Sequence, residues 1–408
     1  MLIIISSGFP FGGEPFLEGE QHFLPKDAIF FALKPGKKSK HAETVQDAYA
    51  IGNRWLIPRT VGHSLLSLFR PAFWREVWRL RKLHKLSLYC FFRALSFDAF
   101  GRLCSREILR ILRGRMGEQK PPMVIYSYWM SSCAYVAGRL QKEFPKAKLI
   151  TRCHGFDVYE DRAPHAYLPF RATILRQEDL ICPISEYGRA YLAKREEGVE
   201  EKLELHRLGT LDRGLAPRLS EKGSMALVSC SLLTPVKRLP LLVEALSLCK
   251  SSLHWIHFGG GSSLEALKDL CRTKLADSPV SFELKGQIPN SEILAFYREN
   301  EIGAFINVSE SEGIPVSIME AISFGIPVLA TAVGGTPEIV LDRENGRLLP
   351  KDLSAQGLAE AIDCFFALSE EQRQDYGRKA REIWEDRYNG ERNYRDFSRR
   401  LKELEQGS

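Results

Sequence analysis

The sequence has 408 residues, 44% of them hydrophobic and 26% charged, with a formal net charge of +6. This size and composition predict a globular protein with two domains. No apolar run reaches the roughly 18–20 residues that a membrane-spanning helix needs. The first residues, Met1 to Gly8, lack a basic segment followed by a long apolar one, so a signal peptide is not expected.

Nine cysteines are scattered along the chain, and none forms a CxxC pair. Several of them fall in apolar runs, such as the ones around Cys182 and Cys230. This usage fits buried free thiols in a reducing cytoplasm, and we do not expect a metal site or a redox function.

Short apolar runs, most of them continuous, alternate with longer amphipathic segments through the whole chain. They predict strands that are buried on both faces. In chain order these strands are expected at Leu2–Ser6, Ala28–Leu33, Met123–Ser127, Lys148–Arg152, Leu180–Pro183, Leu203–Leu208, Ala226–Cys230, Leu253–Phe258, Val280–Leu284, Ile302–Ile306, Pro327–Ala330 and Gly346–Leu349.

Helices are expected between the strands, among them Leu239–Ser247, Ser263–Leu275, Asn290–Asn300 and Ser354–Leu368, with one long charged helix over Gln372–Leu404. Repeated strand–helix alternation predicts an α/β protein with two doubly wound, Rossmann-like domains. We expect an N-terminal domain over 1–210 and a C-terminal domain over 211–384. The final helix, near 385–408, is expected to pack back on the first domain.

The charge is unevenly distributed: Arg54 to Arg115 contain 14 Lys and Arg residues against three acids. Such a basic stretch indicates an anionic partner, which could be a membrane surface, a nucleic acid or a phosphorylated substrate. Within it, Phe73 to Leu86 has the pattern of a helix with Trp74 and Trp78 at the edge of its apolar face. Tryptophan flanked by cations suits the boundary of an anionic membrane, although a solvated face with two half-buried tryptophans explains it equally well.

Two acidic residues, Glu312 and Glu320, lie on either side of an expected helix start at Pro315. Pro315 suits the first turn, and no Ser, Thr, Asp or Asn caps it, so the amides of nearby residues are free to bind an anion. Two carboxylates so close to a phosphate would repel it unless they accept hydrogen bonds from neutral hydroxyls. A nucleotide sugar offers both groups. The expected amide donors are Ile314, Val316 and Ser317, and Gly313 lets the backbone come close to the ligand.

The segment Ser311-Glu-Gly-Ile-Pro-Val-Ser-Ile-Met-Glu-Ala, followed by Phe324-Gly-Ile-Pro-Val-Leu-Ala and Gly334-Gly-Thr-Pro-Glu-Ile, resembles the C-terminal signature of retaining glycosyltransferases of family 4. The signature is a Glu, seven residues and a second Glu. The resemblance implies the GT-B architecture, in which two Rossmann-like domains face each other across a cleft. It also implies that Glu312 contacts the donor sugar and Glu320 the ribose hydroxyls.

Lys237 and Arg238 follow an expected strand and precede a helix, where cations can neutralise a diphosphate leaving group. Members of the family often have an Arg five residues before the Lys, and this position is Leu232 here. Arg238 is the expected substitute.

The run His257-Phe-Gly-Gly-Gly-Ser-Ser-Leu does not match the GxGxxG fingerprint, because position 264, where the third glycine should stand, is Leu264. It is better read as a tight turn at Gly260 beside the nucleotide. The resemblance places Lys285 and Gln287 near the nucleobase.

The loop after the first strand contains Gly12 and Gly13, which the resemblance places near the donor phosphates and the acceptor, although a simple turn is a strong alternative. His154, after the strand at Lys148, is similar to the family's histidine near the transferred sugar. Asp157 is expected to hold an acceptor hydroxyl.

The predicted function is a retaining, metal-independent transferase that moves a sugar from a nucleotide sugar to a glycan or lipid-linked acceptor in envelope polysaccharide synthesis. No cofactor is expected, since no Asp-x-Asp and no metal-ligand spacing occurs. We expect it in the cytoplasm, peripheral on the inner leaflet, with no nucleic-acid partner. The alternatives are a non-catalytic nucleotide-sugar-binding subunit, a glycan phosphorylase or an epimerase with the same architecture.

Overall fold

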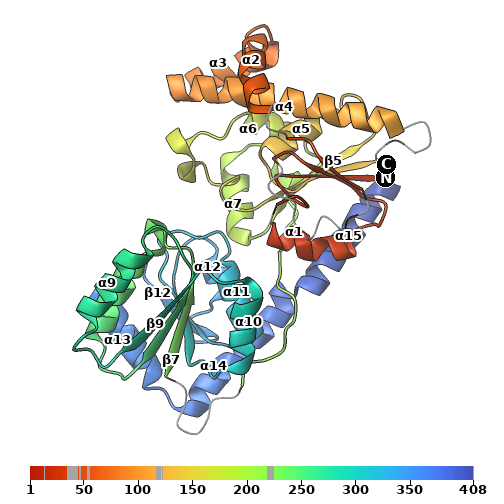
Figure 1. The fold of residues 1–408 in the computed structure, drawn as a ribbon. Helices are drawn as coiled ribbons and strands as arrows, with labels where there is room; N and C mark the ends of the chain where they lie inside the picture. Colours follow the sequence, from red (N-terminus) through yellow and green to blue (C-terminus); the bar gives the residue numbers. More distant parts are fainter. Residues whose placement is uncertain are drawn as a thin grey trace. The chain divides into compact units, whose positions relative to one another are not determined.

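The computed structural model describes residues 1–12, 14–34, 45, 47–52, 56–115, 121, 123–217 and 225–407 (Figure 1). It divides the chain into two compact units. Unit 1 comprises Met1–Leu208 and Glu391–Ser408, and unit 2 comprises Gly209–Gly390. These boundaries lie within six residues of the expected ones at 210 and 384. In the part of the chain that is described, no helix is long and apolar enough to cross a bilayer.

Unit 1 is built on a parallel sheet in the order β3-β2-β1-β4-β5-β6. Its strands are β1 (Leu2–Ser6), β2 (Ile29–Ala32), β3 (Asp47–Ala50), β4 (Val124–Ser127), β5 (Lys148–Cys153) and β6 (Leu180–Pro183). All residues of β1, β2, β4 and β6 are buried, as their continuous apolar runs predict. The expected strand at Leu203–Leu208 is wrong, because only one isolated bridge, from Leu203 to Ile181, forms there.

The helices of unit 1 cover both faces of its sheet (Figure 1). Their bounds are α1 (Pro15–Glu20), α2 (Leu56–Ser67), α3 (Pro71–Lys82), α4 (Leu88–Arg115), α5 (Ser132–Leu140), α6 (Arg171–Gln177) and α7 (Glu186–Arg195). Single 3-10 turns lie at Gln21–Phe23, Glu160–Arg162, Pro164–Ala166 and Glu200–Lys202. Phe73 and Leu80 of α3 are fully buried, as the helical pattern predicts, whereas Leu83 lies beyond the helix and is exposed.

Unit 2 contains a second parallel sheet, in the order β12-β11-β10-β7-β8-β9. The strands are β7 (Ala226–Cys230), β8 (His254–Phe258), β9 (Ser281–Gly286), β10 (Ala304–Asn307), β11 (Val328–Thr331) and β12 (Gly346–Leu349). The chain runs outward from β7 to β9 on one side and returns to β10 on the other. The topological switch point therefore lies between β7 and β10, where ligands of doubly wound sheets bind.

The helices of unit 2 are α8 (Leu239–Leu248), α9 (Leu264–Lys274), α10 (Asn290–Glu299), α11 (Val316–Ser323), α12 (Thr336–Ile339), α13 (Ala355–Phe366) and α14 (Glu370–Ile383). A 3-10 turn at Pro235–Lys237 precedes α8. The single long helix expected over Gln372–Leu404 is in fact two helices, because a π-helical turn at Trp384–Tyr388 and Asn389 separate α14 from α15 (Gly390–Gln406).

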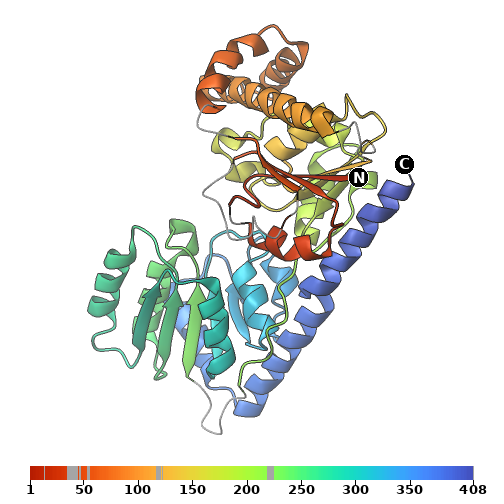
Figure 2. The same cartoon turned by 45° about the vertical axis from the view of Figure 1, so that its right-hand side comes forward.

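Most of α15 packs on unit 1, so that the two ends of the chain lie close together (Figures 1 and 2). Phe397 and Leu401 are buried in the core formed by β1, β2 and β4. The ring of Phe397 lies under the guanidinium of Arg152, 4.1 Å from its centroid, and the amino group of Met1 pairs with Glu405. Arg152 is itself paired with Glu20 at 2.9 Å, and both side chains are fully buried.

Candidate active site

The switch point of unit 2 brings together two of the residues expected to act in catalysis. Lys237 follows β7 and Glu312 follows β10, and these two strands are neighbours in the sheet. The Nζ of Lys237 donates to Oε1 of Glu312 at 2.6 Å, and Asn307 Nδ2 donates to the same oxygen at 3.2 Å. The Glu312 side chain is 10% exposed and that of Lys237 is 23% exposed. Both side chains of the ion pair are thus largely buried, and the exposed part of Lys237 remains accessible to a ligand.

Glu320 lies inside α11, where it accepts a hydrogen bond from Asn290 Nδ2 at 2.9 Å. Burial raises the pKa of Glu320 to about 7, and the bond from Asn290 offsets only part of this effect. With one donor found among the described residues for a nearly buried carboxyl group, Glu320 is suited to accept further hydrogen bonds from hydroxyls.

Arg238 has backbone carbonyl groups as its partners. It donates to the carbonyl oxygens of Val308 at 2.7 Å, Lys351 at 2.8 Å and Ser309 at 3.2 Å. It also adopts a left-handed backbone conformation, with φ of 49°, at the start of α8. These contacts tie the loop after β7 to the loop after β10. The expected contact with a leaving diphosphate remains a prediction.

The start of α11 has no side-chain cap, and Pro315 is its N-cap residue. Gly335 donates its amide to the carbonyl of Gly313 at 2.8 Å, and Ile314 is buried. Among the described residues, no hydrogen-bond partner is found for the amides of Val316 and Ser317. The loop is thus fixed while its amides stay available, as anion binding at a helix start requires.

The other residues of unit 2 that are expected to contact the nucleotide sugar lie at the ends of β8 and β9, the two strands beyond β7 in the sheet. A Cβ on Gly260 would lie 2.9 Å from Cβ of Gln287, so glycine is needed where these two loops meet. Lys285 lies on the edge strand β9, where it is exposed and pairs with Glu283 at 2.6 Å. Contact of Lys285 and Gln287 with a nucleobase stays a prediction.

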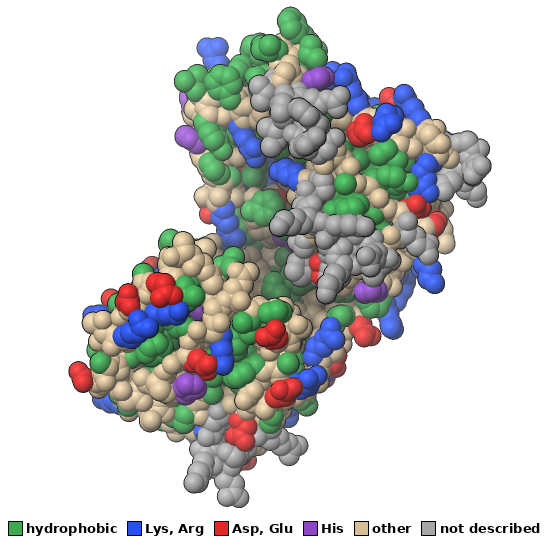
Figure 3. Space-filling model, in the orientation of Figure 1, with side chains coloured by type: hydrophobic (Ala, Val, Ile, Leu, Met, Phe, Trp, Pro, Cys, Tyr) green, Lys and Arg blue, Asp and Glu red, His purple; other side chains and the backbone are tan. Residues whose placement is uncertain are grey.

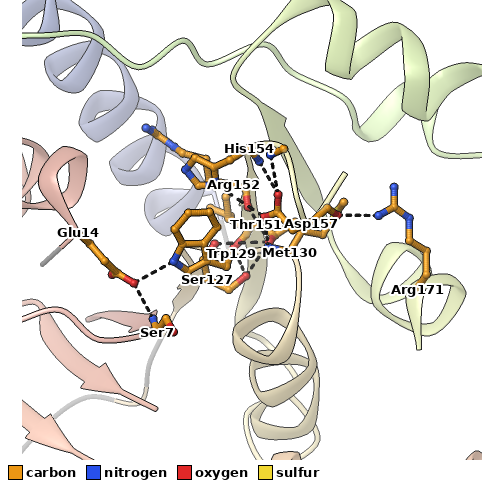
Figure 4. A network of polar contacts seen from close by, with 12 residues as sticks. Ser7, Glu14, Ser127, Trp129, Met130, Thr151, Arg152, His154, Asp157 and Arg171 are labelled. Carbon is orange, nitrogen blue, oxygen red and sulfur yellow. Dashed lines mark hydrogen bonds and ion pairs between the residues drawn. The ribbon is translucent and has the colours of Figure 1, made fainter. Parts of the chain in front are cut away.

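In unit 1, His154 lies directly after β5 and is 9% exposed (Figure 4). Its ring packs against Trp129, with centroids 4.2 Å apart, and against Tyr128 at 4.8 Å. Within the described residues, no hydrogen-bond partner is found for either ring nitrogen, and Nδ1 lies 3.7 Å from Oδ2 of Asp157. Burial lowers the pKa of His154, so the neutral ring is favoured at neutral pH.

Asp157 is fully buried and holds the loop around His154 in place. Its Oδ1 accepts from the amides of His154 at 2.8 Å and Gly155 at 3.0 Å, and its Oδ2 accepts from the amide of Met130 at 3.0 Å. Burial alone would raise the pKa of Asp157, but His154 and these amides hold it below its usual value. The contacts make Asp157 an anchor of the loop, and its expected contact with an acceptor hydroxyl stays a prediction.

Sequence reasoning missed Glu14, which is 9% exposed in the loop after β1. Its Oε1 accepts from the amides of Ser7 at 3.1 Å and Gly8 at 3.2 Å, and from Trp129 Nε1 at 2.9 Å (Figure 4). Burial raises the pKa of Glu14. Of the two glycines expected to shape this loop, Gly12 packs against Gly8, and Gly13 lies outside the described residues.

Residues 217–383, most of unit 2, match the family model described as glycosyl transferases group 1. The whole chain is 25% identical over 395 residues to the putative colanic acid biosynthesis glycosyltransferase WcaL of Escherichia coli, covering 93% of this chain and 94% of WcaL. It is 26% identical over 228 residues to the amylovoran biosynthesis glycosyltransferase AmsK of Erwinia amylovora, covering 53% of this chain and 54% of AmsK.

Solved structures resemble the chain over its full length. A glycosyltransferase from Rickettsia africae has a TM-score of 0.69 at 15% identity and covers 100% of this chain and 99% of its own. HepE of Anabaena, solved in complex with UDP-glucose, has a TM-score of 0.63 at 15% identity and covers 99% of this chain and 100% of its own. The fold is therefore GT-B. The family match over residues 217–383 and the relatives support glycosyltransferase activity.

Proposed function

We propose that the protein is a retaining, metal-independent glycosyltransferase that transfers a sugar from a nucleotide sugar to a glycan or lipid-linked acceptor. The observation that carries the proposal is the pair of Lys237 and Glu312 at the switch point, with Glu320 in the helix that follows. Sugar hydroxyls, ribose hydroxyls and a diphosphate are the chemical groups that such a site would bind.

In this mechanism the leaving diphosphate lies against Lys237 and the free amides at the start of α11. The negative charge on the diphosphate grows as its bond to the sugar breaks, so these donors stabilise the transition state more than the ground state. Glu312 holds the transferred sugar and Glu320 the ribose. Lys237 and Asn307 both donate to Oε1 of Glu312, the carboxylate proposed to hold the sugar. We therefore propose front-face attack rather than a covalent intermediate, with the leaving phosphate accepting the proton of the acceptor.

The substrate class is supported by the relatives, whose names place them in colanic acid and amylovoran biosynthesis. A solved neighbour binds UDP-glucose. We therefore propose a uridine-linked hexose as donor and a growing envelope polysaccharide as acceptor.

The experiment is a donor screen with purified protein. UDP-, GDP- and dTDP-sugars are supplied with and without EDTA, and nucleoside diphosphate release is measured together with the anomeric configuration of any product by NMR. We expect turnover of a UDP-hexose, retention of configuration and full activity in EDTA. Tight donor binding without turnover would favour the binding-subunit alternative, and an inverted product or a strict need for Mg²⁺ or Mn²⁺ would contradict the mechanism.

We also propose that unit 1 docks on an anionic membrane surface through α2, α3 and the start of α4. Ten of the fifteen exposed large apolar side chains in the described residues lie in this region, namely Leu65, Leu66, Phe69, Trp74, Trp78, Leu83, Leu86, Leu88, Tyr89 and Phe92. In Figure 3 hydrophobic side chains gather at the end of unit 1 where α2 and α3 lie. A monomeric protein rarely exposes so many apolar side chains together without a partner.

The cations of this region support a lipid partner rather than a protein one. Arg75, Arg81, Lys82 and Arg93 are exposed among the apolar side chains, and Lys82 lies over the ring of Trp78 at 5.6 Å. Lys85, by contrast, is engaged with Glu160 at 2.7 Å. Each exposed cation near an anionic surface contributes about 1 kcal/mol, which salt weakens.

Sedimentation with phosphatidylglycerol and phosphatidylcholine vesicles tests this surface. We expect binding to the anionic vesicles that falls at high salt and falls again when Arg75, Arg81, Lys82 and Arg93 become Gln. Replacing Lys85 with Gln is the matched control and should change little. If the wild type does not bind either vesicle, or if the fourfold variant binds as well as the wild type, the surface is only solvated.

A further inference from the structure

A row of aromatic rings lies at the carboxyl ends of β4 and β5 in unit 1. Phe156, two residues after His154, is 56% exposed. Its ring lies against that of Trp129, with centroids 4.7 Å apart and planes at 35°, and Trp129 in turn lies against His154. An exposed phenylalanine on the ligand-binding edge of a parallel sheet is not needed by the core, so it calls for an explanation.

Two buried acids, Glu14 and Asp157, hold the row of Phe156, Trp129 and His154 in place. Glu14 accepts the hydrogen bond of Trp129 Nε1, and Asp157 accepts from the amides of His154 and Gly155, the two residues before Phe156. The Oε2 of Glu14 and both ring nitrogens of His154 are buried and have no hydrogen-bond partner in the described structure. Rings held this rigidly, with Phe156 exposed at the end of the row, form a flat apolar surface for the C–H face of a sugar.

The charges around the row select against an anion. Glu14 and Asp157 are the ionisable groups that fix it, and both are acids. Among the described residues, no Lys or Arg stacks on Trp129, Phe156 or His154, and the nearby Arg152 is buried and paired with Glu20. An anion would lie close to these acids and would find no described Lys or Arg stacked on the rings, whereas a neutral sugar meets the apolar face of Phe156.

We propose that Phe156 and Trp129 form the platform on which an uncharged sugar residue of the acceptor stacks, at the edge of the sheet where His154 lies. Glu14 is a positioning residue that sets the orientation of Trp129. This inference rests on the proposed function, since it names the class of acceptor that the same enzyme uses.

The test measures acceptor use and donor hydrolysis separately. Methyl glycosides of glucose, galactose, mannose and fucose serve as neutral probes, and methyl glucuronide serves as the anionic probe, each at saturating donor. We expect at least one neutral glycoside to be glycosylated in preference to the glucuronide. Phe156→Ala should raise the KM for that glycoside about tenfold, with no change in the slow hydrolysis of the donor by water.

Two conservative variants separate stacking from simple burial. Phe156→Tyr keeps the ring and should keep the wild-type KM, whereas Phe156→Leu keeps the apolar area and should behave like Phe156→Ala. The proposal is overturned if the glucuronide is preferred, if no neutral glycoside is used while the donor is hydrolysed, or if Phe156→Ala leaves the acceptor KM unchanged. Absence of any donor turnover in the wild type would instead count against the proposed function.

Discussion

Glu320 is a buried carboxyl group whose pKa is raised to about 7 by burial, which its one described hydrogen bond, from Asn290, only partly offsets. In the free protein, burial favours the protonated form. The stability that protonated Glu320 contributes is therefore fully present below its usual pKa of 4.5 and is lost as the pH rises to about 7. A ribose that donates to Glu320 favours the ionised form, so ligand binding and ionisation support each other.

We predict that the affinity for UDP-glucose rises as the pH increases from 6 to 8. UDP-glucose suits the measurement because neither phosphate of its diester titrates in this range. Glu320→Gln should remove the pH dependence, weaken binding by about tenfold or more, and raise the melting temperature of the free protein at pH 8. Isothermal titration calorimetry and thermal unfolding measure these effects.

Glu312→Gln is the control for this prediction. It should keep the pH dependence of donor binding and reduce turnover instead, because Glu312 is proposed to hold the sugar rather than the ribose. Equal loss of UDP affinity in both variants would contradict the division of roles between the two acids.

Lys237 and Arg238 are adjacent cations with different surroundings. Lys237 reaches the carboxylate of Glu312, whereas Arg238 reaches three carbonyl oxygens. We predict that Lys237→Ala lowers kcat more than it raises KM, since it removes a charge that is proposed to stabilise the leaving diphosphate. Arg238→Ala should chiefly lower the melting temperature, by leaving carbonyl groups of two loops without a donor. A large loss of kcat in Arg238→Ala at an unchanged melting temperature would favour the catalytic role expected from the sequence.

At the scale of elements, the buried strands were predictable because most of their apolar runs are continuous and alternate with longer amphipathic segments. The same pattern located Glu312 after β10 and His154 after β5. Strand β3 was missed because Asp47–Ala50 is a short edge strand with half-buried, partly polar residues. The predicted strand at Leu203–Leu208 failed for a related reason, since its residues up to Arg207 are only half-buried and pair with β6 at a single position.

Contacts between side chains that are far apart in the sequence could not be predicted from it. Glu14 and Trp129 are 115 residues apart, and no local pattern links them. The position of Arg238 at a helix start indicates a nearby anion. The structure instead shows Arg238 donating to the carbonyl oxygen of Lys351, which is 113 residues further along the chain. Topology follows from local pattern, whereas the direction of a polar side chain depends on the complete fold.

The glycines after β8 fix how closely the loops after β7 and β8 approach each other. Gly259 has a φ of +140°, and a Cβ there would lie 1.8 Å from the carbonyl oxygen of Ser231. We predict that Gly259→Ala forces apart the loops after β7 and β8, destabilises unit 2 by about 3 kcal/mol or more, and abolishes donor binding. Chemical denaturation and calorimetry measure both effects.

Gly114→Ala is the matched control for Gly259→Ala. Gly114 lies in the helix α4 of unit 1, and nothing lies within 4 Å of the position where a Cβ would be added. Alanine there should stabilise the protein by about 0.5–1 kcal/mol through its better helix propensity, with donor binding unchanged. If Gly259→Ala behaves like this control, the close approach of the two loops is not needed.

At the scale of the whole molecule, the chain leaves unit 1 at Leu208 and returns to it at Glu391, so that unit 2 is an insertion within unit 1. The returning segment completes the first core. Phe397 is fully buried between Tyr126, at a centroid distance of 5.1 Å, and the guanidinium of Arg152. The folding of unit 1 therefore depends on residues that follow the whole of unit 2 in the sequence.

We predict that Phe397→Ala destabilises unit 1 by about 3–5 kcal/mol, because it leaves a cavity and removes the aromatic face from a buried cation. Hydrogen exchange measured by mass spectrometry should show faster exchange in β1, β4 and β5 and unchanged exchange in β7 and β10. Donor binding by unit 2 should persist at temperatures where unit 1 is stable. The control is Arg399→Ala, a change at an exposed position of the same helix, whose ion pair with Asp396 is worth little at the surface. Equal acceleration of exchange in both sheets would mean that the two units unfold together and that α15 is not a part of unit 1 alone.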